Sequence, residues 1–181
     1  DYINLLLSYE LIAFCFTVLC VAYLIQAFNI IDGLNGLSLS TAIICFLSIS
    51  VIAYDFNNTE MFNSSICLIF ILLAILVLNF PSGKIFIGDS GAYIIGLYIS
   101  ISAIILVSQN INLSPFVIAQ ILIYPSYELF RSVLRRLLVN KKNVLMPDKK
   151  HLHSMLYTYN SHKYLFNYKK INALTSSQII S

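Results

Sequence analysis

Two strings of residues place an aspartate directly beside a glycine, next to an apolar run. One spans residues 29–37 and reads Asn-Ile-Ile-Asp-Gly-Leu-Asn-Gly-Leu around Asp32, and the other spans 79–91 and contains Asp89. Glycines let the backbone turn sharply and leave room for a ligand to approach closely. Mg²⁺ takes one or two carboxylates together with phosphate oxygens and water, so the two aspartates are candidate metal ligands if they share one side of a membrane. The simpler interpretations are a tight turn at Asp32 and a helix N-terminal cap at Asp89.

A third string, residues 147–153, reads Pro-Asp-Lys-Lys-His-Leu-His. Its Lys149, His151 and His153 are side chains that can bind a diphosphate through charge-assisted hydrogen bonds. Two histidines separated by one residue do not share a helix face, which argues against a zinc site. A solvated basic loop is the alternative that this string leaves open.

The elements that carry these strings must lie in a membrane. Of the 181 residues, 59% are hydrophobic and 10% are charged, and the mean hydropathy is +0.82. Because a soluble domain carries about 25% charged residues, the composition excludes a soluble globular domain, a disordered chain and a disulfide-stapled secreted protein. The four cysteines lie in apolar runs without Cys-x-x-Cys spacing, and we expect them to be small buried hydrophobic residues.

Apolar runs along the chain predict an all-α fold, a polytopic transmembrane helical bundle with about five spans. The runs cover residues 11–28, 37–54, 64–80, 92–107 and 115–130, so residues 1–130 form the membrane region together with its loops at 29–37 and 79–91. A spanning helix needs about 20 residues, so the last two runs are short unless their polar flanks contribute. Pro125 is expected to kink the fifth helix, and Glu128 to pair with Arg131.

The positive charges indicate how the bundle is oriented. All 11 Lys and Arg residues fall at Lys84 or within residues 131–170. Because cytoplasmic loops carry the excess of positive charge, the three strings are expected to face the cytoplasm. Residues 131–170 are interpreted as a basic cytoplasmic loop that either anchors on anionic lipid headgroups or binds substrate phosphate. Residues 171–181 are interpreted as the start of a further span that is cut short, or as a frayed tail.

The order and spacing of the three strings resemble those of the polyprenyl-phosphate N-acetylhexosamine-1-phosphate transferases, a family that includes phospho-N-acetylmuramoyl-pentapeptide translocase. The shared patterns are Asn-x-x-Asp-Gly-x-x-Gly-Leu, Phe-x-Gly-Asp-x-Gly and Pro-Asp-x-x-His-x-His, and the resemblance covers residues 17–157. It implies a transferase of the bacterial cytoplasmic membrane that starts the synthesis of a cell-envelope polysaccharide. In the reaction that the resemblance implies, a phosphate oxygen of undecaprenyl phosphate would attack the sugar-linked phosphate of a UDP-N-acetylhexosamine, and UMP would leave.

The same resemblance implies the cofactor, the partners and the type of sugar. The cofactor is Mg²⁺, or Mn²⁺ in its place, and the partners are the two substrates and membrane lipids, with a homodimer as one assembly to test and no nucleic acid. The His-x-His form of the third string is similar to the N-acetylglucosamine branch of the family.

Roles for single residues also follow from the motif match. Asp89 resembles the metal ligand, and Asp32 resembles the acidic group that supports the metal or the nucleotide. His151 and His153 resemble the histidines that help to bind the diphosphate, and with the two aspartates they complete the implied catalytic set. Phe86 resembles the aromatic residue that stacks on uracil. The implied substrate-binding residues are Asn29, Asn35, Asn79, Phe86 and Lys149.

This sequence departs from the family pattern at several positions. The family usually has Asp at the position of Asn35 and often Arg at that of Lys149, and Lys is not equivalent to Arg at a bidentate phosphate site. The family also carries an adjacent pair of aspartates on an earlier cytoplasmic loop, which has no counterpart in this sequence. We therefore expect the chain to be the C-terminal portion of a longer enzyme, or a truncated product that is inactive alone.

Two other classes of protein are alternatives. Alcohol phosphotransferases with CDP-linked donors carry a motif that resembles Asp-Gly-x-x-Ala-Arg, from which this sequence departs at Gly36. A non-enzymatic scaffold or transporter piece would place charges within the apolar runs, whereas four of the five runs contain none.

Overall fold

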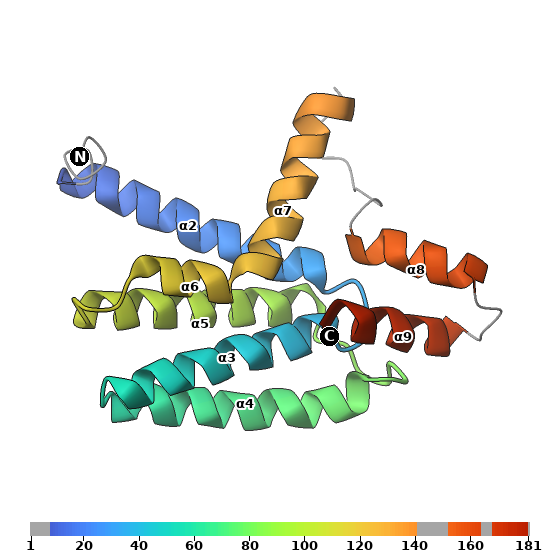
Figure 1. Ribbon diagram of the computed structural model, residues 1–181, viewed down its shortest axis with the longest axis horizontal. Coiled ribbons are helices and arrows are strands. Elements are labelled where there is room, and N and C mark those ends of the chain that lie inside the picture. The colour runs from blue at the N-terminus through green and yellow to red at the C-terminus, as the bar shows by residue number, and fades with distance from the viewer. Residues whose placement is uncertain (1–7, 141–151, 164–167, 181) are drawn as a thin grey trace.

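The computed structural model describes residues 8–140, 152–163 and 168–180, and all regular secondary structure in these ranges is helical (Figure 1). Four of the described helices are long and apolar enough to cross a bilayer: α2 (Glu10–Ile31), α3 (Leu37–Asp55), α4 (Thr59–Asn79) and α5 (Gly88–Gln109). They coincide with the first four apolar runs. The predicted all-α, multi-pass membrane fold is therefore confirmed.

The most enclosed of these four helices is α3. Within its apolar stretch 61% of the residues are buried, against 11% for α2 and 22% for α4. α3 packs on α4, on α5 and on the later helix α9 (Tyr168–Ile180), and its Leu39, Phe46 and Ile49 side chains are almost fully buried. The outward apolar faces of α2 and α4 are stable in lipid, because hydrocarbon tails are as apolar as the side chains themselves.

The packing of α2 against α5 brings the two aspartate loops together. At Gly96 of α5, a Cβ atom would lie 2.7 Å from the Cα of Ile25 in α2, so only glycine permits this approach of the two backbones. Small residues at such crossings are the usual device for close helix packing in membranes. The crossing lies roughly two helical turns from Asp32 along α2 and from Asp89 along α5.

The fifth expected span, residues 115–130, is not one helix. It consists of a short helix α6 (Pro115–Ile121) and a helix α7 (Ile123–Arg135), which meet at Leu122. Pro125 has no N–H to donate to the carbonyl of Ile121, and its ring crowds that carbonyl. The Sγ of Cys45 lies 3.7 Å from the freed Ile121 oxygen. The predicted kink is confirmed, and it is strong enough to divide the run.

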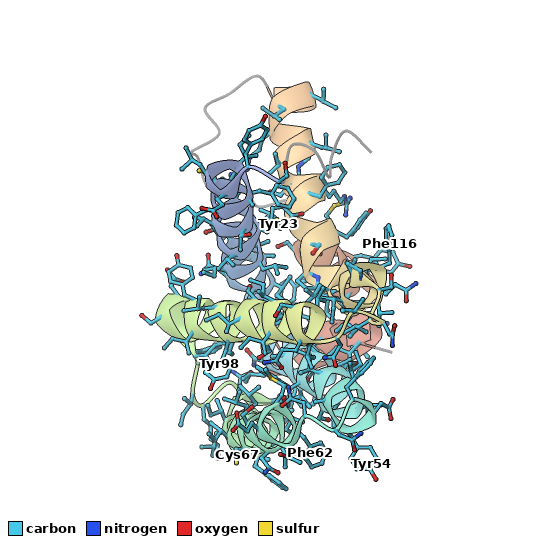
Figure 2. All side chains as sticks on the ribbon, turned by 90° about the vertical axis from the view of Figure 1, so that its left-hand side faces the viewer. Tyr23, Tyr54, Phe62, Cys67, Tyr98 and Phe116 are labelled. Carbon is cyan, nitrogen blue, oxygen red and sulfur yellow. The ribbon has the colours of Figure 1, made fainter. Side chains whose placement is uncertain are left out.

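The polarity of α7 is the reverse of that of a helix on a soluble protein. Its outward residues Ile123, Tyr127, Phe130 and Leu134 are apolar, whereas Glu128 and Ser132 are buried. Such a pattern suits a helix with lipid outside and protein inside. Tyr23 lies where α7 meets α2 (Figure 2). Its hydroxyl donates a 2.6 Å hydrogen bond to the Ser126 carbonyl. The pairing of Glu128 with Arg131 stays a prediction.

Two helices follow the interval 141–151, which lies outside the described residues. α8 (Leu152–Lys163) packs against α9, where Asn160 Nδ2 donates to Thr175 Oγ1 at 2.9 Å and to Gln178 Oε1 at 2.8 Å. Residues 131–170 are thus partly helical: α7 continues to Arg135, the π-helix η1 (Arg136–Asn140) follows, and α8 lies beyond. The interpretation of residues 171–181 as the start of a further span stays a prediction.

Candidate functional site

The two aspartate loops lie at the same end of the bundle (Figure 1). α2 ends at Ile31 and Asp32 follows as its C-cap, whereas α5 begins at Gly88 and Asp89 lies in its first turn. Because the two helices pack side by side and run in opposite directions, the end of one lies beside the beginning of the other. The fold therefore places both carboxylates on one end of the membrane region.

The pKa of the Asp32 carboxyl is raised by the groups around it. Asp32 is half-buried, and the hydroxyl of Ser38 donates a hydrogen bond to its Oδ1. Burial raises the pKa of the Asp32 carboxyl to about 6, the Ser38 hydrogen bond opposes that rise, and the negative charge of Asp89 adds to it. The two carboxylates therefore repel each other, which makes a divalent cation between them electrostatically favourable.

Mg²⁺ fits the chemistry of this pair. It is commonly held by one or two carboxylates and completes its octahedron with water and substrate phosphates. Asp89 is exposed, so its carboxylate is open to solvent and ligand. Within the described residues, no group of three His, Cys, Asp or Glu side chains could hold a metal. The described part of the chain thus offers an open two-carboxylate site rather than a closed metal cage.

Asn79, at the end of α4, joins the two loops. Its Oδ1 accepts a hydrogen bond from the Gly36 N–H, and its Nδ2 donates to the Ile85 carbonyl at 2.7 Å. The side chain is 4% exposed, so both of its polar atoms are used inside the protein. Asn79 therefore holds the Asp32 loop against the loop that precedes Asp89, and its predicted contact with a nucleotide stays a prediction.

Asn35 makes a second connection between the loops. Its side-chain Nδ2 donates to the Pro81 carbonyl at 3.1 Å. Its backbone N–H donates to Asn172 Oδ1 at 2.8 Å, and its carbonyl accepts from Ser176 Oγ at 2.6 Å, both on α9. Neither α9 residue could be recognised from the sequence, because no local pattern links positions separated by 137 and 141 residues.

Gly36 allows the loops to meet. Its φ of +78° lies in the left-handed region, and an added Cβ would lie 3.0 to 3.2 Å from side-chain atoms of Phe80. An L side chain is strained at such a φ whatever the space around it. The glycine in the first string is thus required by backbone conformation and by the contact with the second loop.

Two other predicted substrate residues, Phe86 and Asn29, lie near the two aspartate loops. Phe86 is 66% exposed on the loop before α5, so most of its side chain is accessible. Asn29 is half-buried in the last turn of α2, where its carbonyl accepts from the Asp32 N–H at 3.4 Å and its Oδ1 from Gln26 Nε2 at 3.5 Å. Contacts of both residues with a substrate stay predictions.

The third string falls almost wholly outside the described residues. Lys149 and His151 belong to the undescribed interval, and His153 lies in the first turn of α8 with a side chain that is likewise outside the description. The binding of a diphosphate by these residues stays a prediction.

The chain is similar in sequence to one family of known proteins. Residues 2–107 match the family described as glycosyl transferase family 4. The chain is 33% identical over 145 residues to a probable undecaprenyl-phosphate N-acetylglucosaminyl 1-phosphate transferase of Bacillus subtilis strain 168, covering 80% of this chain and 40% of that protein. It is 30% identical over 138 residues to the undecaprenyl-phosphate α-N-acetylglucosaminyl 1-phosphate transferase of Thermotoga maritima, covering 76% and 41% of the two chains.

A more distant similarity links the chain to phospho-N-acetylmuramoyl-pentapeptide-transferase of Staphylococcus carnosus, with 32% identity over 81 residues that cover 45% of this chain and 25% of that protein. No solved structure matches the chain. The chain spans about two fifths of the length of the first two relatives, 40% and 41%.

Proposed function

Since the chain belongs to glycosyl transferase family 4, we propose that the protein transfers N-acetylglucosamine 1-phosphate from UDP-N-acetylglucosamine to undecaprenyl phosphate. An oxygen of the lipid phosphate attacks the sugar-linked phosphorus, the bond from that phosphorus to the bridging oxygen breaks, and UMP leaves with the electron pair. The product is a lipid diphosphate sugar. The activity is proposed for the whole protein, of which this chain corresponds to about two fifths of a relative's length, 40% in the B. subtilis case.

The observation that carries the proposal is the arrangement of Asp32 and Asp89. Both come from strings that match the family pattern, and the charge of one raises the pKa of the other. Catalysis of phosphoryl transfer consists mainly of positioning and charge neutralisation, so two carboxylates beside an open, exposed face are the parts that the reaction needs. Mg²⁺, when bound, neutralises the negative charge of the diphosphate.

The residues of this chain are assigned separate tasks. Asp89 and Asp32 hold the cation, and Phe86 stacks on uracil through its exposed ring. Asn35 and Asn79 keep the two loops in register, because each spans from one loop to the other. His151, His153 and Lys149 bind the diphosphate, and the whole site faces the cytoplasm of a bacterium. These assignments extend the family resemblance and are part of the proposal.

An apolar groove supports a prenyl-chain acceptor. The groove has a volume of 730 Å³, lies between α2, α6 and α7, and is lined by residues that include Phe16, Tyr23, Ala119 and Phe130. Its walls are almost entirely apolar, which suits an isoprenoid chain. The lipid phosphate would then approach the site from within the membrane, while the nucleotide comes from water.

The proposal is tested by the release of UMP. Purified protein is mixed with UDP-N-acetylglucosamine, undecaprenyl phosphate and Mg²⁺, and UMP and the lipid product are measured. Asp89→Asn should lower kcat by about a hundredfold or more, because it removes one of the two charges that hold the cation. Asp55→Asn is the matched control, since Asp55 is an exposed aspartate at the other end of α3.

Two results would contradict the proposed transferase activity and its metal site: no UMP release by the intact protein, or full activity of the Asp89→Asn variant. UDP-N-acetylmuramoyl-pentapeptide is offered as a second donor, and its preferential use would contradict the assigned sugar. Residues 1–181 by themselves are proposed to release no UMP, because the adjacent pair of aspartates found in the family has no counterpart in them.

A further inference from the structure

We infer that α9 is a positioning element of the candidate site, in which Asn172 and Ser176 fix the backbone of Asn35 and so hold the Asp32 carboxylate in place. The inference rests on the proposed function for its catalytic readout, but its structural part can be tested without it. No string of the sequence assigns either residue a role.

Both backbone hydrogen-bonding groups of Asn35 are bound by α9. The N–H donates to Asn172 Oδ1 at 2.8 Å, and the carbonyl accepts from Ser176 Oγ at 2.6 Å. All three residues are buried, with exposed fractions of 4% for Asn35, 3% for Asn172 and 0% for Ser176. A buried backbone group that loses its partner pays a desolvation penalty, so the loop cannot leave α9 at low cost.

The fixed position of Asn35 is transmitted to Asp32 through a short turn. Ser38 donates to the Asp32 carboxylate and so joins the two ends of the turn, and Asn79 accepts from the N–H of Gly36 within it. The intervening Leu34 is buried at 8% exposure. With the turn closed and Asn35 and Gly36 held, little freedom remains for Asp32 to change its direction relative to Asp89.

α9 also contacts α8 and α3, in addition to the Asn35 loop. Asn160 of α8 donates to Thr175 Oγ1 and Gln178 Oε1 on α9. Asn160 is as well buried as Asn172, at 1% exposure, and both are amides that bind α9 to a neighbour. The pair therefore separates two contacts of α9: loss of Asn160 weakens its contact with α8, whereas loss of Asn172 releases the Asp32 loop.

The experiment compares Asn172→Ala and Ser176→Ala with the matched control Asn160→Ala in the intact protein in lipid nanodiscs. Hydrogen–deuterium exchange is measured on peptides that cover residues 32–37. We expect exchange in this loop to be faster by between about fivefold and about a hundredfold in the two α9 variants, the effect of leaving one buried partner unsatisfied. In Asn160→Ala the loop should exchange at the unsubstituted rate, while peptides of α8 and α9 exchange faster.

Kinetics on the same samples tests the positioning role. Removing a side chain that orients a metal-binding group costs about 10- to 100-fold in activity, so kcat should fall by that factor in Asn172→Ala. The KM for the UDP-sugar should stay near its original value, because the loss affects geometry rather than uniform binding. Asn160→Ala should keep its kcat.

Three results would overturn the inference, and a fourth would overturn only the proposed function. Unchanged loop exchange in both α9 variants, or an equal acceleration in Asn160→Ala, would overturn the inference. Faster loop exchange with unchanged kcat would also overturn it, because the loop would then be held for stability alone. If the unsubstituted protein shows no UMP release but the exchange pattern is as expected, the proposed function fails and the contact of α9 with the loop stands.

Discussion

At the scale of single residues, the ionisation of Asp32 sets the pH range in which the proposed cation site would bind its ion. Its pKa rises from the ordinary 3.8 to about 6, first because of burial and then because of Asp89. Folding therefore takes up a proton between these two values, so the contribution of Asp32 to the free energy of unfolding decreases as pH rises from 3.8 to about 6. The affinity for a cation should change in the opposite direction and rise with pH, because the cation needs the ionised carboxylate.

We predict that Mg²⁺ affinity falls about tenfold per pH unit below the pKa of Asp32 and levels off above it. Isothermal titration with Mg²⁺ across a pH series measures this midpoint, which we expect at about 6. Ser38→Ala should move the midpoint upward, since it removes the hydrogen bond that favours the ionised form. Ser48→Ala, whose hydroxyl bonds only to Ile44 of its own helix, is the control. A midpoint that does not respond to Ser38→Ala would contradict the assignment of the titration to Asp32.

A second prediction at this scale concerns the glycines of the loops. Gly36→Ala places a side chain in the left-handed region and against Phe80, so it should lower the stability of the protein by about 1–3 kcal/mol. Gly88→Ala also has a positive φ, of +62°, but nothing lies within 4 Å of its added Cβ. The thermal midpoint in detergent should therefore decrease more for Gly36→Ala than for Gly88→Ala. Equal decreases would show that contact with Phe80 does not matter.

At the scale of elements, the groove between α2, α6 and α7 exists because the fifth apolar run is broken. Pro125 could be recognised as a kink from the sequence, whereas its consequence could not, because the angle between α6 and α7 depends on packing against α2 and on the Cys45 contact. The four unbroken helices were predictable because their runs are apolar, and the polar flanks of the fourth run extend it to the 22 residues of α5. The role of α9 was not predictable, because Asn172 and Ser176 bond to the backbone of Asn35, which lies 137 and 141 residues earlier in the chain.

The groove leads to a prediction on the lipid substrate. Ala119 is an exposed small residue on its wall, so Ala119→Trp should fill the groove and raise the KM for undecaprenyl phosphate by about tenfold, or ~1.4 kcal/mol. The KM for the UDP-sugar should not change. Val117→Trp is the matched control, because Val117 lies on the same short helix but lines a different pocket. Equal effects of the two substitutions on the lipid KM would rule out this groove as the lipid site.

At the scale of the whole molecule, the site is assembled from parts that are far apart along the chain. The two aspartates were predictable from local strings, and their positions at one end follow from an even number of crossings between them. What the sequence did not indicate is how the loops are held: Asn79 and Asn35 each bond to the opposite loop, and no local pattern predicts these contacts. Their predicted contacts with a substrate stay predictions.

A further prediction concerns which ends of the helices face the cytoplasm. All positive charges lie at Lys84 or beyond residue 130, so the loop that contains Ile85 should face the cytoplasm and Thr59 the opposite side. In a variant without native cysteines, a membrane-impermeant maleimide added to intact cells should label Thr59→Cys and not Ile85→Cys. Opening the cells should expose Ile85→Cys. The reverse pattern would place the aspartates on the outer face.

The crossing at Gly96 has a consequence for how variants of this protein are interpreted. Position 96 is uncharged and lies roughly two turns of helix below the aspartates, yet any larger residue there would force the Ile25 backbone aside. The displacement would spread the two helices and widen the separation between Asp32 and Asp89. A change from glycine to alanine within this apolar helix would then lower activity although it alters no polar group. A search confined to polar residues would overlook its origin.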